Sequence, residues 1–250
     1  MLIIAISNQK GGVGKTTSAL NLGAGLAELG RRVLLVDLDP QSSLTLATVG
    51  DHAGFSMAEV LGSVQPGALQ LADIILNIKT GLDIAPADIA LSVTELGLVT
   101  RHGRENVLKR ALANASDYDY CLIDCGPSLG LLVVNALTAA DYVIPPTLPT
   151  ALDLRGLKLF LESVETVRQN LNPNLQLMGI IVCQYQERLK LHKAAMADLE
   201  NSGLPILGAV NKSIQAAVSM GSGEALAGGV LADQYKQIAE KVDQWQKTRI

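Results

Sequence analysis

Two lysines flank a glycine-rich segment near the start of the chain, where residues 10–17 are Lys-Gly-Gly-Val-Gly-Lys-Thr-Thr. In a loop that opens a helix, glycines let backbone N–H groups converge on phosphate oxygens, and the helix N-terminus adds partial positive charge. Lys15 would reach the β and γ phosphates of a nucleotide, Thr16 would offer its hydroxyl to Mg²⁺, and Thr17 would donate to the α-phosphate. The expected nucleotide-binding residues are Gly11, Gly12, Val13, Gly14, Lys15, Thr16 and Thr17.

A strand and a helix must flank this segment to position it. The apolar run Leu2–Ile6 precedes it, and the leucines that follow share one face of a helix, namely Leu20, Leu22, Leu26 and Leu29. A glycine-rich lysine loop between a strand and a helix is the context in which such a loop binds phosphate. Without these neighbours, the same residues would indicate only a solvated turn.

Carboxylates follow two further apolar segments. Val33–Val36 leads into Asp37-Leu-Asp39-Pro, and Tyr120–Ile123 leads into Asp124-Cys-Gly-Pro. In an open α/β sheet, ligands bind at the carboxyl ends of the strands. Asp124 would accept hydrogen bonds from the waters of Mg²⁺ and complement Thr16. Asp37 and Asp39 would order metal waters or the attacking water, or one of them would cap the turn before proline.

The loop departs from the usual P-loop at two positions. Gln9 stands where the first glycine is expected, and Lys10 adds a second lysine. In this the chain resembles the ParA/MinD family of P-loop ATPases, whose deviant Walker A motif is K-G-G-x-G-K-T-T. The resemblance implies ATP and Mg²⁺ as cofactors. It also implies that Lys10 reaches across a homodimer interface to the partner's phosphates, whereas the residues alone leave open that Lys10 only extends the positive field of its own site.

The same resemblance assigns roles to the remaining site residues. Asp37 matches an outer-sphere Mg²⁺ partner, Asp39 matches the residue that orients the hydrolytic water, and Asp124 matches the Walker B aspartate. The implied catalytic residues are Lys10, Lys15 and Asp39, and the implied metal-site residues are Thr16, Asp37 and Asp124.

Some segments differ from the family pattern. Gly126 replaces a proline of the usual D-C-P-P, and the loop 210–225 has Lys212 and Gln215 in place of arginines. In the family this loop contributes to adenine binding and to the dimer face. On that basis Asn211 is the candidate base contact.

Composition and periodicity predict one α/β domain over residues 1–250, with a doubly wound, mostly parallel sheet and helices on both faces. The chain has 250 residues, of which 48% are hydrophobic, enough for a sizeable core. The expected strands are Leu2–Ser7, Val33–Asp37, Leu82–Ala85, Tyr120–Asp124, Tyr142–Pro145, Met178–Cys183 and Ile206–Val210. The expected helices are Thr17–Leu29, Glu105–Ala115, Leu129–Ala139, Leu154–Leu171, His192–Glu200 and Asp233–Gln246.

Cysteine usage and hydropathy favour a cytoplasmic protein. The three cysteines, Cys121, Cys125 and Cys183, lack zinc-ribbon spacing and are expected to be buried thiols. No apolar run reaches the roughly 18 residues of a membrane span, and the first strand leaves no room for a signal peptide. A redox ATPase like the nitrogenase iron protein would need cluster-ligating cysteines, and only Cys125 lies near the site.

Charge bears on whether the chain binds DNA, as position-sensing members of the family do without sequence preference. The net charge is −4, but residues 185–250 hold eight Lys or Arg against seven Asp or Glu, whereas the rest holds 12 against 17. Arg188, Lys190, His192 and Lys193 cluster there. Such a group would bind phosphates in a salt-dependent manner, or it is an ordinary solvated helix face.

The final helix offers an alternative function. Tyr235, Ile238, Val242 and Trp245 form a narrow apolar stripe. In MinD-like relatives a C-terminal amphipathic helix attaches to the membrane, but acidic residues here interrupt the basic face that such anchors need. Packing on the domain itself is therefore the favoured role. The leading interpretation is a ParA-type ATPase that acts at the nucleoid with a ParB-like or cargo-adaptor activating protein, and the alternative is a MinD-like membrane-associated ATPase.

Overall fold

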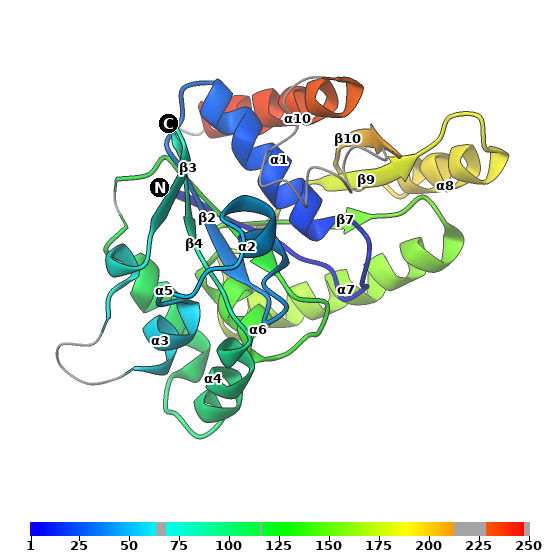
Figure 1. Ribbon diagram of the computed structural model, residues 1–250. Helices are drawn as coiled ribbons and strands as arrows, with labels where there is room; N and C mark the ends of the chain where they lie inside the picture. The colour runs from blue at the N-terminus through cyan, green and yellow to red at the C-terminus, as the bar shows by residue number, and fades with distance from the viewer. Residues whose placement is uncertain (64–68, 116, 213–228, 248–250) are drawn as a thin grey trace.

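The computed structural model describes residues 1–63, 69–115, 117–212 and 229–247. Its main sheet has seven strands: β1 Leu2–Ile6, β2 Val33–Leu38, β3 Leu76–Lys79, β4 Leu82–Ala85, β5 Tyr120–Cys125, β6 Tyr142–Ile144 and β8 Gln176–Leu177. Their spatial order is β3-β4-β2-β5-β1-β6-β8. Every neighbouring pair is parallel except β3 with β4, so the mostly parallel sheet predicted from the sequence is confirmed (Figure 1).

A second sheet of three parallel strands continues from the first. It consists of β7 Pro146–Thr147, β9 Ile180–Tyr185 and β10 Ile206–Asn211, in the order β10-β9-β7. Because β7 follows β6 after one residue, the chain passes from the main sheet directly into the second. The end of β9 is thereby brought to the same region as the end of β1.

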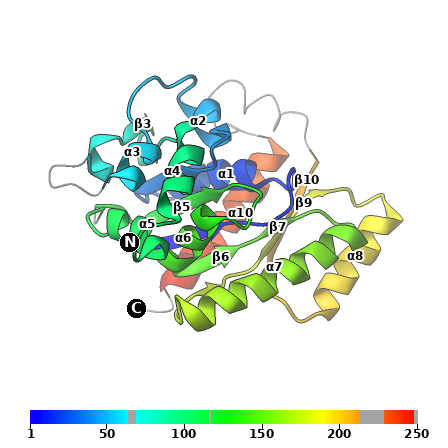
Figure 2. The same ribbon diagram turned by 90° about the horizontal axis from the view of Figure 1, so that it is seen from below.

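Helices cover both faces of the main sheet, as predicted. They are α1 Lys15–Glu28, α2 Ser43–Thr48, α3 Met57–Gly62, α4 Ala90–Leu98, α5 Val107–Leu112, α6 Leu131–Ala139, α7 Ala151–Asn170, α8 Lys190–Asn201 and α10 Val230–Lys247. One face carries α1 and α10, and the other carries α4, α6 and α7 (Figures 1 and 2).

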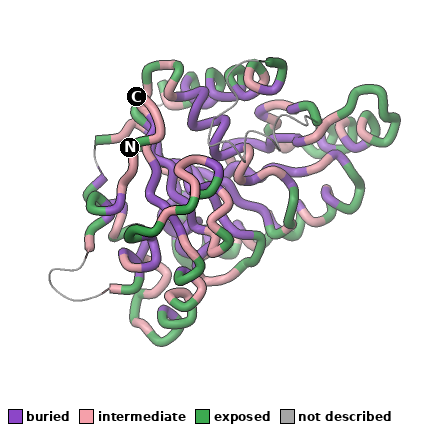
Figure 3. The backbone as a smooth tube through the Cα atoms, in the orientation of Figure 1, coloured by how far each residue is buried: buried purple, intermediate pink, exposed green. Residues whose placement is uncertain are grey.

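Side-chain alternation along the strands divides the interior into two cores. In β2, Val33 and Leu35 pack with α1 and α10, whereas Leu34 and Val36 pack with the helices of the other face. This period of two is what a strand buried on both faces requires. Figure 3 shows the buried residues concentrated along the strands and α1. Close approach of α1 needs Gly23, since a Cβ there would lie 2.8 Å from Leu35 Cδ2.

The sequence-based prediction placed most elements but missed several short ones. All seven expected strands and all six expected helices are present. The ends of β4 agree with the prediction and the other elements are shifted at one end or both; the helix predicted at Glu105–Ala115, for example, is a 3₁₀ turn followed by α5. The short helices α2, α3 and α4 and the short strands β3, β7 and β8 were not predicted. None of them is long enough to show a clear apolar period.

The C-terminal helix packs inside the fold. Tyr235, Ile238 and Val242 are buried against α1 and β10, and Arg31 Nε lies 2.7 Å from Asp243 Oδ1. The prediction that this helix packs on the domain is confirmed. Among the helices described, none is both long and apolar enough to cross a membrane.

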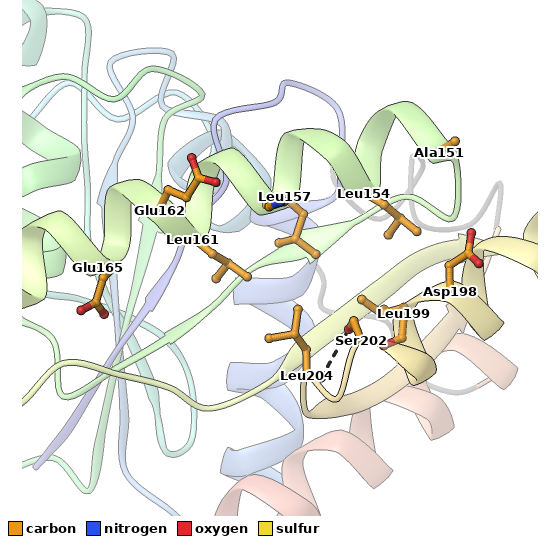
Figure 4. A pocket seen from close by; sticks show the side chains of 11 residues that line it. Ala151, Leu154, Leu157, Leu161, Glu162, Glu165, Asp198, Leu199, Ser202 and Leu204 are labelled. Atoms are coloured by element: carbon orange, nitrogen blue, oxygen red, sulfur yellow. Dashed lines mark hydrogen bonds between the residues drawn. The ribbon is translucent and has the colours of Figure 1, made fainter.

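A smaller satellite core, made of Leu157, Ile180, Val182 and Leu199, lies between the second sheet and the helices α7 and α8. Next to it, α7 and α8 leave an apolar groove of about 750 Å³. Figure 4 shows Leu154, Leu157 and Leu161 of α7 facing Leu199 and Leu204 across this groove. Its lining comes from α7, α8 and the turn after α8, so it is separate from the glycine-rich loop.

Candidate nucleotide-binding site

The glycine-rich loop connects β1 to α1 in a conformation that only glycine adopts readily. Gly12 has φ 73° and Gly14 has φ 95°, both in the left-handed region. Gly14 is also the N-cap residue of α1, which has neither a side-chain cap nor an acidic residue in its first turn. No N-cap side chain therefore occupies the start of α1, and the helix dipole favours an anion there.

Neighbouring elements hold the loop in place. The Asn8 side chain donates to the Pro146 carbonyl at 2.8 Å and accepts from Lys10 N at 3.2 Å. From the other side, Cys183 of β9 lies so close that a Cβ on Gly14 would be 3.1 Å from its Sγ. Contacts with β7 and β9, together with the Asn8 side chain, thus fix the backbone before any ligand arrives.

A cavity of about 290 Å³ opens above the loop. It is lined by Gly11, Gly12, Gly14, Lys15, Thr16 and Thr17, together with Asp39, Ser43, Pro127 and Gln184. The structure therefore brings six of the seven predicted loop residues to one cavity. Val13 is the exception, because its side chain is buried.

The two lysines of the loop point to different places. Lys15 lines the cavity, and its ammonium donates to the Lys10 carbonyl at 3.0 Å. Burial lowers the pKa of Lys15, and the nearby Asp124 carboxylate partly opposes this. Lys10 instead extends toward α7, where its Nζ lies 2.6 Å from Asp153 Oδ1. Asp153 is buried near the start of α7 and is hydrogen-bonded to Thr150.

Asp124 provides the test of whether the site fits Mg²⁺. Parallel pairing sets it beside Ile6 at the end of β1, next to the loop. The side chain is fully buried, and neither carboxylate oxygen has a hydrogen-bond partner of normal geometry among the described residues. A buried carboxylate without partners is costly unless a cation or its waters satisfy it. Asp124 and Thr16 therefore fit a hydrated Mg²⁺, which when bound would neutralise phosphate charge.

Electrostatics support the same interpretation of Asp124. Burial raises the pKa of Asp124 well above its usual value, and the charge of Asp37 on the adjacent strand adds to the effect. Thr16 and Lys15 act in the opposite direction. A divalent cation would favour the ionised form of Asp124, so binding of Mg²⁺ should release protons.

Asp37 caps a helix. Its Oδ2 accepts from both Thr45 N, at 2.8 Å, and Thr45 Oγ1, at 2.7 Å, and its Oδ1 accepts from Asp39 N at 3.1 Å. These bonds hold the start of α2, in line with the capping alternative that the Asp-Pro sequence suggested. Burial raises the pKa of Asp37 to about 6. A contact of Asp37 with Mg²⁺ waters stays a prediction.

Asp39 is half-buried and faces the cavity. Its Oδ1 accepts from Gln41 N at 3.0 Å, which shapes the turn after β2. Gly126 lies against it, since a Cβ on Gly126 would be 3.4 Å from the Asp39 carboxylate. The carboxylate therefore keeps an oxygen directed at the cavity and available to a water.

Asn211 does not line the cavity. It ends β10, is exposed, and its backbone N donates to Gln234 Oε1 at 2.9 Å. Gln215, which replaces an arginine of the family pattern in the following loop, lies outside the described residues. The structure instead brings Gln184 and Ser43 to the cavity, both of which the sequence analysis missed. The only signal for Gln184 was its position at the carboxyl end of a strand, a place where ligands bind in this class of sheet.

Replacing Asp124 with asparagine should stabilise the nucleotide-free protein while removing its response to Mg²⁺. At pH 7 the free energy of unfolding should rise by about 1 to 2 kcal/mol, because asparagine removes a carboxyl group whose ionised form is destabilised by burial without partners. Raised carboxyl pKa values mean that the folded protein holds protons that the unfolded chain releases. Because the pKa of Asp37 is raised to about 6 and that of Asp124 is raised as well, stability of the wild type should fall as pH rises from about 4 through 6, and less so in the variant. Chemical denaturation across this range measures both effects.

The matched control is Asp51→Asn, since Asp51 is exposed and lies outside the site. It should leave both stability and Mg²⁺-dependent nucleotide binding unchanged. A less stable Asp124→Asn protein, or one whose nucleotide affinity still rises with Mg²⁺, would contradict the assignment.

A doubly wound sheet with a glycine-rich loop between β1 and α1 defines the P-loop class of nucleotide-binding proteins. The family model described as an AAA domain matches residues 1–177. The sporulation initiation inhibitor protein Soj of Bacillus subtilis is 46% identical over 194 residues, which are 76% of this chain and 75% of Soj. The chain belongs to the ParA/Soj family of P-loop ATPases.

Two further similarities bear on length and on the ligand. An uncharacterised protein of Mycobacterium tuberculosis is 46% identical over 197 residues, which are 78% of this chain but 62% of that protein. A crystal structure of cobyrinic acid a,c-diamide synthase from Mycobacterium smegmatis, with bound ATP analogue and magnesium, superposes with a TM-score of 0.84 at 36% identity. That alignment covers 100% of this chain and 97% of the other.

Proposed function

We propose that this chain is an ATP-driven switch of the partitioning type. Two copies close on ATP and Mg²⁺, bind DNA without sequence preference, and separate after ATP is hydrolysed to ADP and phosphate. A ParB-like or cargo-adaptor protein stimulates that hydrolysis. The cargo is a plasmid, a chromosome region or a protein assembly, and the switch acts in the cytoplasm at the nucleoid. Membership of the ParA/Soj family supports this proposal.

The position of Lys10 carries the proposal. Lys15 already serves the cavity of its own subunit, whereas Lys10 turns away from that cavity toward Asp153 and is 40% exposed. A second copy docked over the loop would meet the Lys10 ammonium at its surface. A nucleotide held by one subunit and completed by Lys10 of the other makes dimerisation depend on ATP.

The arrangement of carboxylates supports hydrolysis. Asp124 and Thr16 would hold a hydrated Mg²⁺, which would neutralise charge on the phosphates, and Asp39 faces the cavity from the end of β2. Phosphoryl transfer depends on positioning and on charge neutralisation more than on covalent chemistry. Asp39 is therefore suited to orient the attacking water.

A basic group beside the second sheet supports DNA binding. Arg188, Lys190 and Lys193 are exposed where β9 leads into α8, at the end of the molecule away from α3 and α5 (Figures 1 and 2). α8 begins without a side-chain cap and without an acidic residue in its first turn. Free N–H groups and lysines together suit a phosphate.

Two other basic residues of the C-terminal part have structural partners. Lys241 donates to the Leu207 carbonyl at 2.6 Å, and Lys247 lies 2.8 Å from Asp243. Arg249 lies outside the described residues. Among the described residues, the exposed basic side chains that remain in this part of the chain are Arg188, Lys190, Lys193, Lys212 and Lys236, of which the first three lie together where β9 leads into α8.

Removing Lys190 and Lys193 should weaken DNA binding and reduce its salt dependence. Binding of a labelled duplex, followed by fluorescence anisotropy over a salt series, should require ATP in the wild type. In Lys190→Ala/Lys193→Ala the slope of log affinity against log salt should fall by about 2 per subunit, because each lost phosphate contact removes roughly one unit. Nucleotide binding should be unaffected.

The control is Lys158→Ala, which removes an exposed lysine of α7 beside the groove with α8. Its salt slope should match the wild type. DNA binding that is independent of ATP, or a slope unchanged in the double variant, would contradict the proposal. Binding to anionic vesicles in place of DNA would favour the MinD-like alternative, which the buried stripe of α10 argues against.

A further inference from the structure

Gln184 lines the nucleotide cavity from the end of β9. Asp39 and Pro127 follow β2 and β5, which lie on one side of β1. β9 lies on the other side, beyond β6 and its continuation β7, and Figure 1 shows β7 and β9 beside the start of α1. Gln184 therefore faces the end of the cavity opposite to the residues that handle the terminal phosphate.

The direction of Gln184 breaks the alternation of β9. Ile180 and Val182 pack in the satellite core with α7 and α8, whereas Ile181 and Cys183 pack in the core of α1 and α10. Regular alternation would turn the next side chain back to the α7–α8 face. Instead the Gln184 side chain lies on the side of the glycine-rich loop, and the Tyr185 side chain packs against the satellite core.

A β-bulge causes this change of direction. Val182 pairs with Ala209 and Tyr185 pairs with Asn211, so two residues of β9 oppose one of β10. Gln184 has φ 55°, in the left-handed region that residues other than glycine rarely adopt. Bulges re-aim side chains next to binding sites, and unusual backbone conformations cluster there.

The chemistry of the amide fits a nucleobase. Lys15, Thr16 and Asp39 account for the phosphates and the metal, which leaves the β9 side of the cavity for the nucleoside. A glutamine amide offers a donor and an acceptor side by side, and these match the N7 acceptor and N6 donor of adenine. Guanine presents two acceptors, N7 and O6, along the same edge. We propose that Gln184 hydrogen-bonds the base of the nucleotide and selects adenine over guanine, an inference that rests on the proposed ATP site.

Gln184→Gly tests this inference, since glycine keeps the left-handed backbone and removes only the amide. Affinities for ATP, GTP and inorganic triphosphate are measured by calorimetry with Mg²⁺ present. The variant should bind ATP about tenfold more weakly than the wild type, as expected for loss of a paired base contact. Its affinities for GTP and for triphosphate should stay at the wild-type values, so that the preference for ATP disappears.

Two further variants sharpen the test. Gln184→Glu keeps the shape but lacks the donor, so it should lose ATP affinity as the glycine variant does. Gln234→Ala removes an amide that contacts Asn211 outside the cavity, and it should bind ATP as the wild type does. An unchanged ratio of ATP to GTP affinity in Gln184→Gly, or an equal loss of triphosphate affinity, would overturn the inference while leaving the ATP site standing. A wild type that binds neither ATP nor triphosphate would overturn the proposed function as well.

Discussion

Lys10→Ala is expected to bind ATP with near wild-type affinity and yet to remain monomeric and inactive. Hydrolysis should fall by about 10³-fold, the scale on which a cation supplied in trans accelerates phosphoryl transfer. The reason is that Lys10 is absent from the cavity of its own subunit, whereas Lys15 lines it. Calorimetry would measure the ATP affinity, and light scattering would measure the mass of the protein with ATP.

The control for this variant must separate the dimer contact from the ion pair with Asp153. Lys10→Ala leaves the buried Asp153 carboxylate without its cation, which costs stability. Asp153→Asn breaks the same pair but keeps the Lys10 ammonium. It should therefore retain ATP-dependent dimerisation and hydrolysis. Two results would show that Lys10 acts only within its own subunit. One is an ATP-dependent dimer of the Lys10→Ala protein, and the other is an Asp153→Asn protein that neither dimerises with ATP nor hydrolyses it.

Sequence patterns predicted the parts of the site that lie at the ends of apolar strands. Asp39 and Asp124 follow long buried runs, and parallel strands bring their carboxyl ends to one edge. The loop between β1 and α1 was predictable because its glycines have few other uses in that context. Local signals of this kind identify a residue's place without any knowledge of its distant neighbours.

Other features of the site depend on contacts that no local pattern contains. The Lys10–Asp153 pair joins residues far apart in the chain, and Asp153 is buried only because α7 begins beside the loop. Gln184 reaches the cavity through a bulge, and a bulge is one extra residue in a strand that otherwise alternates normally. The sequence pointed instead to Asn211, which the structure places outside the cavity.

Capping by Asp37 shows a further limit of local patterns. The sequence left its role open between a metal partner and a turn cap. Its bonds to Thr45 depend on the short helix α2, which was not predicted. Whether Asp37 contacts a metal water or caps a helix depends on the conformation of the segment that follows it.

Asp39→Ala is expected to trap the ATP-bound dimer. Turnover should fall by about 10² to 10³-fold, because the attacking water loses the carboxylate that orients it. ATP affinity should stay close to wild type, since Lys15 and the loop remain intact. Single-turnover hydrolysis would give the rate, and light scattering with ATP would show a persistent dimer.

The Asp39 carboxylate also shapes the turn after β2 by accepting from Gln41 N, so alanine alone does not isolate its chemical role. Asn in place of Asp keeps an oxygen for that hydrogen bond and removes the charge. If Asp39 orients water, Asp39→Asn should be as inactive as Asp39→Ala and should form the same stable dimer. If the turn is what matters, Asp39→Asn should hydrolyse ATP at the wild-type rate while Asp39→Ala does not. Only the first outcome is consistent with an Asp39 carboxylate that positions the attacking water.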